Sequence, residues 1–335
     1  IKRLRMVSKV YKNIDILKKQ EYIFKIKAKF LKEFCKNLNL IPVTAPIFVT
    51  EKSGLQDRLS GVERPVKFDV KKTGETLEVV QSLAKWKRIA LKKYNFPMHK
   101  GLCVDMKAIR RDDCLDNIHS IFVDQWDWEK VIKNEDRNLE YLKQTVKLIV
   151  KSIVKTSKYL QKIGFRKQFK LSNDVKFITS QELCDMFPDK SPKQREYEIV
   201  KKFKTVFIIG IGDLLKNGER HDSRSPDYDD WTLNGDLFFY HDINDMALEV
   251  SSMGIRVNKS KMIEQIEKFG NFNEFNQEYH KLIKENKLPL TIGGGIGQSR
   301  ICQLLLERKH IGEVQVSYWD KENIKYSHNN SINLL

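Results

Sequence analysis

The segment at residues 291–300, TIGGGIGQSR, has the composition of a phosphate-binding turn. Glycines let a backbone approach a ligand closely, and the N–H groups at the start of a helix attract anions. Arg300 would lie one turn into the helix that follows, where its charge can reach a phosphate. The segment is neither a dinucleotide-binding fingerprint nor a P-loop, because it lacks their defining glycine, acidic and lysine positions. The alternative is a turn needed only for tight packing, and the position of Arg300 favours phosphate.

Residues 122–128, FVDQWDW, are expected to form a strand whose alternate side chains share a face. Gln125 and Asp127 would then point to one side, and Trp126 and Trp128 into a buried core on the other. A carboxamide beside a carboxylate is well suited to recognise an ammonium or amide group. Taken alone, the pattern is also typical of an edge strand with one wetted face.

Residues 247–256, ALEVSSMGIR, are also strand-like, and alternation places Glu249 and Ser251 on one face. A carboxylate beside a nucleotide suits Mg²⁺, which prefers hard oxygen ligands and bridges phosphates. Asp236, in the string LNGD, supplies a second carboxylate for the same ion. These two carboxylates, Asp236 and Glu249, are therefore the predicted metal ligands.

Two charged segments have both a functional and a structural explanation. Lys87 lies at the expected strand-to-helix turn in QSLAKWKR, where the helix dipole disfavours a cation, so a bound carboxylate or phosphate would account for it. A surface lysine is the alternative. The acidic residues 227–230 follow a basic stretch that contains His221 and Arg224, and they fit a substrate site and a solvated loop held by ion pairs equally well. We expect His221 itself to be structural or solvent-facing.

The elements that position these residues follow from hydrophobic periodicity. Helices are predicted at residues 13–38, 86–94 and 139–160, with a last helix ending at 306, and strands at 40–50, 77–80, 106–110, 121–128, 205–212, 237–240 and 248–251. Pro42 and Pro46 make the first strand an edge or interface strand, since proline cannot donate to a sheet ladder. Residues 155–176 are the best candidate for a surface excursion. Without a regular strand–helix alternation, the fold class is α+β, with a largely antiparallel central sheet flanked by helices.

The length of 335 residues is ample for a buried core, and without internal repeats or a linker we expect a single catalytic domain over residues 1–335. Residues 1–12 form a basic, poorly patterned start. The formal net charge of +17 would suit polyanions. The lysines are spread along the whole chain, which favours a solvated surface instead.

Five cysteines, an odd number, show neither zinc-knuckle nor redox-pair spacing, so we expect a reducing, cytoplasmic location. No run approaches the ~18 apolar residues of a membrane span, so no membrane partner is expected. No signal peptide is visible in the sequence.

Taken in order, these segments resemble the three signature motifs of class II aminoacyl-tRNA synthetases. A long helix that feeds a strand with Pro46 resembles motif one, which lies at a dimer interface. A strand that ends in Arg110 resembles motif two, whose arginine holds the α-phosphate of ATP. The glycine-rich turn with Arg300 resembles motif three, whose arginine meets the γ-phosphate.

A closer resemblance is to the ammonia-dependent asparagine synthetases, or aspartate–ammonia ligases. The strings that carry it occur in that family's order from about residue 41 to 316: QDRLSG, SLAKWKR, MKAIR, HSIFVDQWDWE, SQEL, IGIG, RHDSRSPDYDDW, LNGD, LEVSSMGIRV, PLTIGGGIGQSR and HIGEVQ. The resemblance implies a class II synthetase-like fold, a homodimer, and ATP with Mg²⁺. The implied reaction joins L-aspartate and ammonia to L-asparagine through a β-aspartyl-adenylate, with release of AMP and pyrophosphate.

The resemblance and the motifs together predict the site. The catalytic positions are Asp57, Arg110 and Gln125, with Asp57 accepting the proton that ammonium must lose. Aspartate would be held by Ser82, Lys87, Asp127, Arg224, Asp229, Ser251, Ser252 and Arg256. ATP would be held by Arg110, Glu249, Gly295, Gly297 and Arg300, and Mg²⁺ by Asp236 and Glu249. The chain departs from the family at Gln81, where histidine is expected, and between Trp231 and Leu233, where it is several residues shorter and the shape of a loop is left open.

Two alternatives were weighed. A tRNA synthetase would explain the positive charge, but almost no length remains for an anticodon-binding domain, so a nucleic-acid partner is not expected. A binding protein with a relict active site would have lost Arg110, Arg300 or Glu249, and all three are present. A glutamine-dependent enzyme would need an amidase domain with a cysteine at its start, so free ammonia is the expected nitrogen source.

Overall fold

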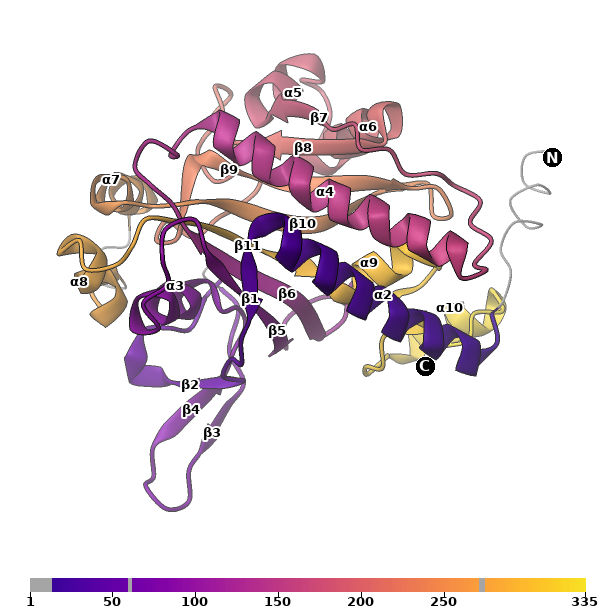
Figure 1. The fold of residues 1–335 in the computed structure, drawn as a ribbon, viewed down its shortest axis with the longest axis horizontal. Helices are drawn as coiled ribbons and strands as arrows, with labels where there is room; N and C mark the ends of the chain where they lie inside the picture. The colour runs from indigo at the N-terminus through magenta and orange to yellow at the C-terminus, as the bar shows by residue number, and fades with distance from the viewer. Residues whose placement is uncertain (1–13, 60–61, 271–274) are drawn as a thin grey trace.

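The structure is a computed structural model of the chain and describes residues 14–59, 62–270 and 275–335. Eight strands of the described chain form the main sheet (Figure 1). Their order is β1 (Leu40–Pro42), β5 (Gly101–Ile109), β6 (Phe122–Val131), β11 (Thr291–Gly297), β10 (Met246–Arg256), β9 (Asp229–His241), β8 (Thr205–Ile209) and β7 (Lys176–Thr179). The six inner strands pair antiparallel, and only the edge strands β1 and β7 pair parallel. The predicted α+β class with a largely antiparallel sheet is confirmed.

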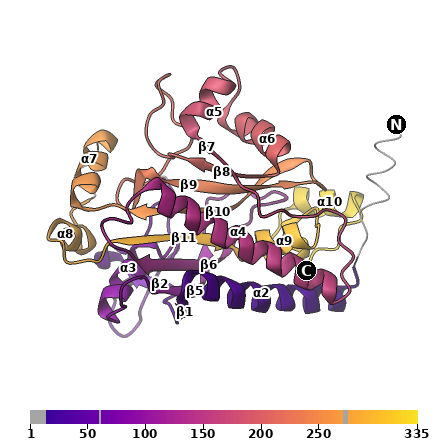
Figure 2. The same ribbon diagram turned by 45° about the horizontal axis from the view of Figure 1, so that its top comes forward.

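Two long helices, α2 (Ile16–Leu38) and α4 (Leu139–Lys162), lie side by side over one face of this sheet (Figures 1 and 2). Each begins at a side-chain cap, Asp15 for α2 and Asn138 for α4. Their apolar stripes bury against Trp126 and Trp128 of β6, and the ring of Phe30 lies 4.3 Å from that of Trp126. The two tryptophans are therefore core, as predicted, and Gln125 and Asp127 face the opposite side of the sheet.

The remaining elements lie at the margins of the sheet. Helix α3 packs on the opposite face, over β5 and β6. A small sheet of β2 (Phe48–Thr50), β4 (Thr76–Val79) and β3 (Lys67–Asp69) projects from the body (Figure 1). The other helices are α3 (Ala84–Lys93), α5 (Ser180–Met186), α6 (Pro192–Phe203), α7 (Lys259–Phe269), α8 (Glu278–Lys284), α9 (Gln298–Leu305) and α10 (Lys321–Asn329), with 3₁₀ turns η1 (Glu51–Ser53) and η3 (Ile311–Glu313).

The prediction of one strand over residues 40–50 is wrong. Residues 40–42 form β1 at the edge of the main sheet, and residues 48–50 form β2 in the small sheet. The chain leaves the main sheet after Pro42, and Pro46 lies in the connection, because neither proline has an N–H group to offer a ladder. The edge position that the prolines predicted for the first part is correct.

The prediction of a glycine-rich turn at residues 293–297 is also wrong. These residues belong to β11, between β6 and β10. A Cβ atom on Gly294 would lie 2.4 Å from the Cβ of Met253, and one on Gly293 would lie 1.9 Å from Oε2 of Glu129. The glycines therefore leave room for side chains of the neighbouring strands, and helix α9 begins only at Gln298.

Several predicted bounds change as well. Strands β5, β9 and β10 are longer than predicted, because the ladder continues from Gly101 in β5, from Asp229 in β9 and over residues 246–256 in β10. Trp231 and Leu233 lie inside β9, so the shortened stretch forms no loop. The proposed surface excursion at residues 155–176 begins with the last turns of α4, where Leu160 is fully buried. Residues 1–12 lie outside the described residues.

All five cysteines are described and are free thiols. Among the described residues, no helix combines the length and the apolarity needed to cross a bilayer.

Candidate active site

A cavity of about 510 Å³ lies on the face of the sheet opposite α2 and α4. It is lined by strands β6, β9, β10 and β11, by helices α3 and α9, and by the segments around residues 57, 110–120 and 222–228. Of the predicted site residues, only Asp236 does not line it. The fifteen that do are Asp57, Ser82, Lys87, Arg110, Gln125, Asp127, Arg224, Asp229, Glu249, Ser251, Ser252, Arg256, Gly295, Gly297 and Arg300. The fold thus brings together positions more than two hundred residues apart in the sequence.

Lys87 lies at the inner end of the cavity and is 1% exposed, so it is not the surface lysine of the alternative explanation. Its Nζ forms an ion pair with Asp127 and donates to the backbone carbonyls of Trp128 at 3.0 Å and Gly294 at 3.3 Å. The anion that offsets its position near the start of α3 is therefore a carboxylate of the protein. Burial raises the pKa of Asp127 although Lys87 opposes it.

Arg256 joins two buried carboxylates at the same end. Its Nη2 lies 2.8 Å from Oε2 of Glu129, and its Nη1 pairs with Asp229. Thr291 donates to Oε1 of Glu129 at 2.6 Å. Burial raises the pKa of Asp229, whereas Arg256 and Lys87 overcome burial and lower the pKa of Glu129. Sequence reasoning missed Glu129, although strand alternation from Gln125 and Asp127 points to it.

The acidic residues 227–230 are buried and fully paired, so the solvated-loop explanation is wrong. Asp227 pairs with Lys85 and His280, Asp229 with Arg256, and Asp230 with Arg137. Tyr228 and Asp229 both line the cavity, and Tyr228 was not among the predicted residues. His221 is buried and pairs with Glu196, as expected of a structural histidine.

Within the part of the chain that the structure describes, three buried polar atoms of cavity-lining side chains have no hydrogen-bond partner: Oδ2 of Asp127, Oγ of Ser251 and Nε of Arg224. Buried polar groups are nearly always hydrogen-bonded in folded proteins, so each exception requires an explanation. A bound polar molecule that offers both a cation and an anion would satisfy all three. These atoms therefore mark the inner end as the place for a small zwitterionic ligand.

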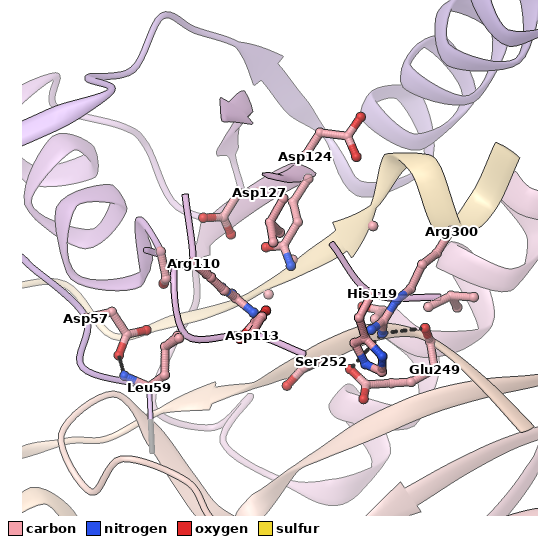
Figure 3. A pocket seen from close by; sticks show the side chains of 18 of the residues that line it. Asp57, Leu59, Arg110, Asp113, His119, Asp124, Asp127, Glu249, Ser252 and Arg300 are labelled. Carbon is pink, nitrogen blue, oxygen red and sulfur yellow. Dashed lines mark hydrogen bonds and ion pairs between the residues drawn. The ribbon is translucent and has the colours of Figure 1, made fainter. Parts of the chain in front are cut away.

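Arg110 lies between Asp57 on one side of the cavity and Arg300 with Glu249 on the other (Figure 3), and Gln125 of β6 also lines the cavity. Arg110 is oriented by a bond from its Nε to the carbonyl of Gln81 at 3.2 Å. Asp57 is 2% exposed and accepts the N–H of Leu59 at 2.9 Å. A Cβ on residue 295 would lie 2.2 Å from Oε1 of Gln125, so Gly295 makes room for that carboxamide. All three side chains are therefore held in place before any ligand binds.

The outer end is more open. Nη1 of Arg300 donates to the backbone carbonyl of Glu249 at 2.9 Å and lies 3.9 Å from its carboxylate. His119 and Asp116, from the loop after β5, lie beside them and were not predicted. The sequence around Asp116 and His119 gave little indication of their place, because an irregular loop has no periodicity from which the direction of a side chain can be inferred.

The two predicted metal ligands differ. Glu249 faces the cavity, whereas both oxygens of Asp236 accept from Nη2 of Arg224, at 2.7 and 2.9 Å. Burial, with help from Glu249, raises the pKa of Asp236 to about 7 against the opposing charge of Arg224. The described residues contain no group of three or more acidic, histidine or cysteine side chains that could hold a metal. Glu249 fits Mg²⁺ as one carboxylate beside phosphates and water, and Asp236 as oriented does not offer its oxygens.

A family model described as aspartate–ammonia ligase matches residues 17–331. The chain belongs to the aspartate–ammonia ligase family. An aspartate–ammonia ligase of Clostridium perfringens strain 13 is 52% identical over 98% of both chains, and one of Clostridium tetani is 50% identical over 98% of this chain and 97% of the relative.

Solved structures resemble this family member in fold. An asparaginyl-tRNA synthetase of Pyrococcus horikoshii, complexed with asparaginyl-adenylate, has a TM-score of 0.63 and 16% identity, over 89% of this chain and 68% of that one. An asparaginyl-tRNA synthetase of Entamoeba histolytica, also with asparaginyl-adenylate, has a TM-score of 0.61 and 13% identity, over 91% and 68%. At such identities the likeness shows the fold alone, and that fold is the predicted class II synthetase-like one.

Proposed function

We propose that the chain is an ATP-dependent ligase that converts L-aspartate and ammonia to L-asparagine, through a β-aspartyl-adenylate and with release of AMP and pyrophosphate. Membership of the aspartate–ammonia ligase family supports the overall reaction. The observation that carries the proposal is the division of one cavity into a buried end suited to a zwitterion and an open end with Arg300. Arg110 and Gln125 lie between the two ends, where the acyl group would react.

The inner end would hold aspartate. It carries the cations Lys87 and Arg256 against the carboxylates Asp127, Glu129 and Asp229, so its formal charge is negative by one and attracts an ammonium group. The α-amino group would lie near Asp127 and Asp229. The carboxylates of the substrate would take the donors that remain, which belong to Ser82, Arg224, Ser251, Ser252 and Arg256. Lys87 would act through its charge, because its three N–H groups already donate to Asp127, Trp128 and Gly294.

The first step would be attack of the aspartate β-carboxylate on the α-phosphorus of ATP, which displaces pyrophosphate. Positioning and charge neutralisation dominate such a transfer. Arg110 would stabilise charge on the α-phosphate, and Arg300 would neutralise the leaving pyrophosphate, with the backbone of Gly295 and Gly297 close to the nucleotide. Glu249 would hold Mg²⁺, and that ion would supply further neutralisation of phosphate charge.

In the second step, ammonia would attack the acyl carbon and displace AMP. Ammonium must first lose a proton, and Asp57 is the proposed acceptor. Gln125 would polarise the acyl oxygen through its N–H groups. Asp57→Asn is expected to lower asparagine formation sharply while pyrophosphate release in the absence of ammonia persists. Full activity of Asp57→Asn at saturating ammonium would contradict this role.

We further propose a single catalytic domain that assembles as a homodimer in the cytoplasm. Exposed apolar side chains on α2 and on the small sheet, among them Leu17, Phe24 and Phe48, support an interface between copies. Sedimentation of the purified chain measures this directly. A species of monomer mass at micromolar concentration would contradict the dimer.

The deciding experiment is pyrophosphate release from ATP and Mg²⁺ with aspartate, with and without ammonium, while asparagine is scored by mass. Asparagine formed only with ammonium, one for each AMP, is the expected result. Adenylate formation without asparagine would mean that another acceptor replaces ammonia. No consumption of ATP would overturn the proposal altogether.

A further inference from the structure

A buried polar network lies behind the inner end of the cavity. Asp227, 0% exposed, accepts from Nζ of Lys85 at 2.6 Å and from Nε2 of His280 at 2.9 Å, both at Oδ2, while its Oδ1 accepts the Ser225 hydroxyl at 2.6 Å. Burial opposes ionisation, yet Lys85 and His280 hold the pKa of Asp227 well below its ordinary value. The carboxylate of Asp227 is therefore charged and fully paired, while Lys85 and Ser225 also line a second, small cavity. A buried charge of this kind is costly to maintain.

His280 takes part as a neutral donor. Its Nδ1 accepts the backbone N–H of Gln277 at 3.2 Å, so the ring proton resides on Nε2 and is directed at Asp227. The helices that carry His280 and Lys85, α8 and α3, lie near one another in both views (Figures 1 and 2). The network thus joins two helices to the segment that contains Asp227.

Lys85 and Asp227 are each linked to a different part of the site, and His280 acts through Asp227. Lys85 is two residues from Lys87 on α3, and its Nζ lies 3.4 Å from the carbonyl of Gln56, the residue before Asp57. Asp227 is followed directly by Tyr228 and Asp229, which line the cavity. None of Lys85, Asp227 and His280 is among the described residues that line the main cavity.

We propose that Lys85, Asp227 and His280 are positioning residues, which fix the aspartate-holding segment and the Asp57 loop relative to each other. The inference rests on the proposed function, because it assigns these residues to the aspartate and ammonia steps of that reaction. It follows from geometry: Lys85 and Asp227 connect α3, the Gln56–Asp57 segment and residues 227–229, and each of these three carries a group that would contact aspartate or ammonia. His280 braces Asp227 from α8. Small displacements of reacting groups are sufficient to lower rates greatly.

The test is Lys85→Met, with Lys85→Arg as the charge-preserving comparison. We expect Lys85→Met to raise the aspartate KM about tenfold or more, since misplacement far from the chemistry can cost up to about a hundredfold. The ATP KM should change little, because the network does not reach the outer end. The ratio of asparagine to pyrophosphate should fall below that of the wild type, as water replaces ammonia at the adenylate and returns aspartate and AMP. For Lys85→Arg, the aspartate KM and the ratio of asparagine to pyrophosphate should lie between those of Lys85→Met and those of the wild type.

His280→Gln provides a second variant if Lys85→Met does not fold, and it should show a smaller change in the same direction. His241→Gln is the matched control. His241 is also a buried histidine that accepts a backbone N–H at Nδ1, but it lies at the far end of β9 from the cavity. It should lower the melting temperature without altering the aspartate KM or the product ratio.

The outcomes separate the two proposals. Wild-type protein that makes no asparagine overturns both. An active wild type with folded Lys85→Met and His280→Gln variants of unchanged aspartate KM and product ratio overturns only the positioning role. If Lys85→Met and His280→Gln change only the melting temperature, as is expected of His241→Gln, the positioning role is likewise overturned.

Discussion

The two ends of the cavity are built on different principles. At the inner end, the side chains of Lys87, Asp127, Glu129, Asp229 and Arg256 are at most 4% exposed, and every charge has a partner in the protein. At the outer end, the side chains of Arg300, Glu249, His119 and Asp116 are 21% to 46% exposed. The inner end has its charges paired and buried, with only single atoms of Asp127, Ser251 and Arg224 left without a partner among the described residues, whereas the outer end is more exposed and freer to adjust. Under the proposed function, the rigid end would hold aspartate and the more exposed end would hold the polyphosphate of ATP.

Removing the central cation of the inner end should have the largest effect. Arg256→Met leaves Glu129 and Asp229 buried without their partner, and breaking a buried pair costs about 3–5 kcal/mol. Urea unfolding of the variant measures this loss. Arg300→Met is the comparison at the outer end, and its stability should stay within about 1 kcal/mol of the wild type. Equal losses of unfolding free energy in Arg256→Met and Arg300→Met would mean that the inner end depends on its paired charges no more than the outer end does.

Arg300→Met should instead act on catalysis. Loss of one charge-stabilising donor typically lowers kcat about 10²–10³-fold, and we expect a decrease of that order in pyrophosphate release. Steady-state kinetics with varied ATP provides the measurement, and Arg300→Lys serves as control, since a point charge replaces part of the neutralisation but not the fork geometry. A wild-type rate of pyrophosphate release in Arg300→Met would contradict a role of Arg300 in neutralising the pyrophosphate.

Gly295→Ala tests the middle of the cavity. The added methyl group would meet Oε1 of Gln125 and displace its carboxamide, so we expect kcat to fall about ten- to a hundredfold. Gly164→Ala places its methyl group where nothing lies within 4 Å. Its positive φ, which Gly295 does not share, should lower stability but leave kcat unchanged. Unchanged kinetics of Gly295→Ala would show that Gln125 need not occupy its present place.

The smallest expected effect is the pH dependence of aspartate binding. Burial raises the pKa values of Asp127 and Asp229, so these carboxyls become protonated at a higher pH than exposed ones. As pH falls through those values, the inner end loses negative charge and its attraction for the α-ammonium group. The aspartate KM should therefore rise toward acid, by at most about tenfold per pH unit for each group, while the ATP KM changes less. In Asp229→Asn the aspartate KM should be high and should depend less on pH.

The sequence predicted the cavity far better than the backbone that carries it. The facing directions of Gln125 and Asp127, and of the alternating Trp126 and Trp128, could be predicted because strand alternation is a local pattern. The Gly-rich strand β11 was mistaken for a turn, because its glycines reflect crowding by Met253 and Glu129 of other strands. Lys85 and His280 gave no signal, since a buried ion network depends on contacts between distant segments. Arg224 was predicted at the site, but its pairing with Asp236 could be seen only once both were placed.

The position of β11 also has a consequence for how the chain is made. This strand completes the middle of the main sheet, yet it is synthesised after the seven other strands of that sheet. Until they emerge from the ribosome, β6 and β10 present open edges that no part of the nascent chain can occupy in the native order. Until then the two halves of the sheet are not paired with each other, and their open edges can form non-native pairs or aggregate. Chaperones should therefore matter most before β11 has been synthesised.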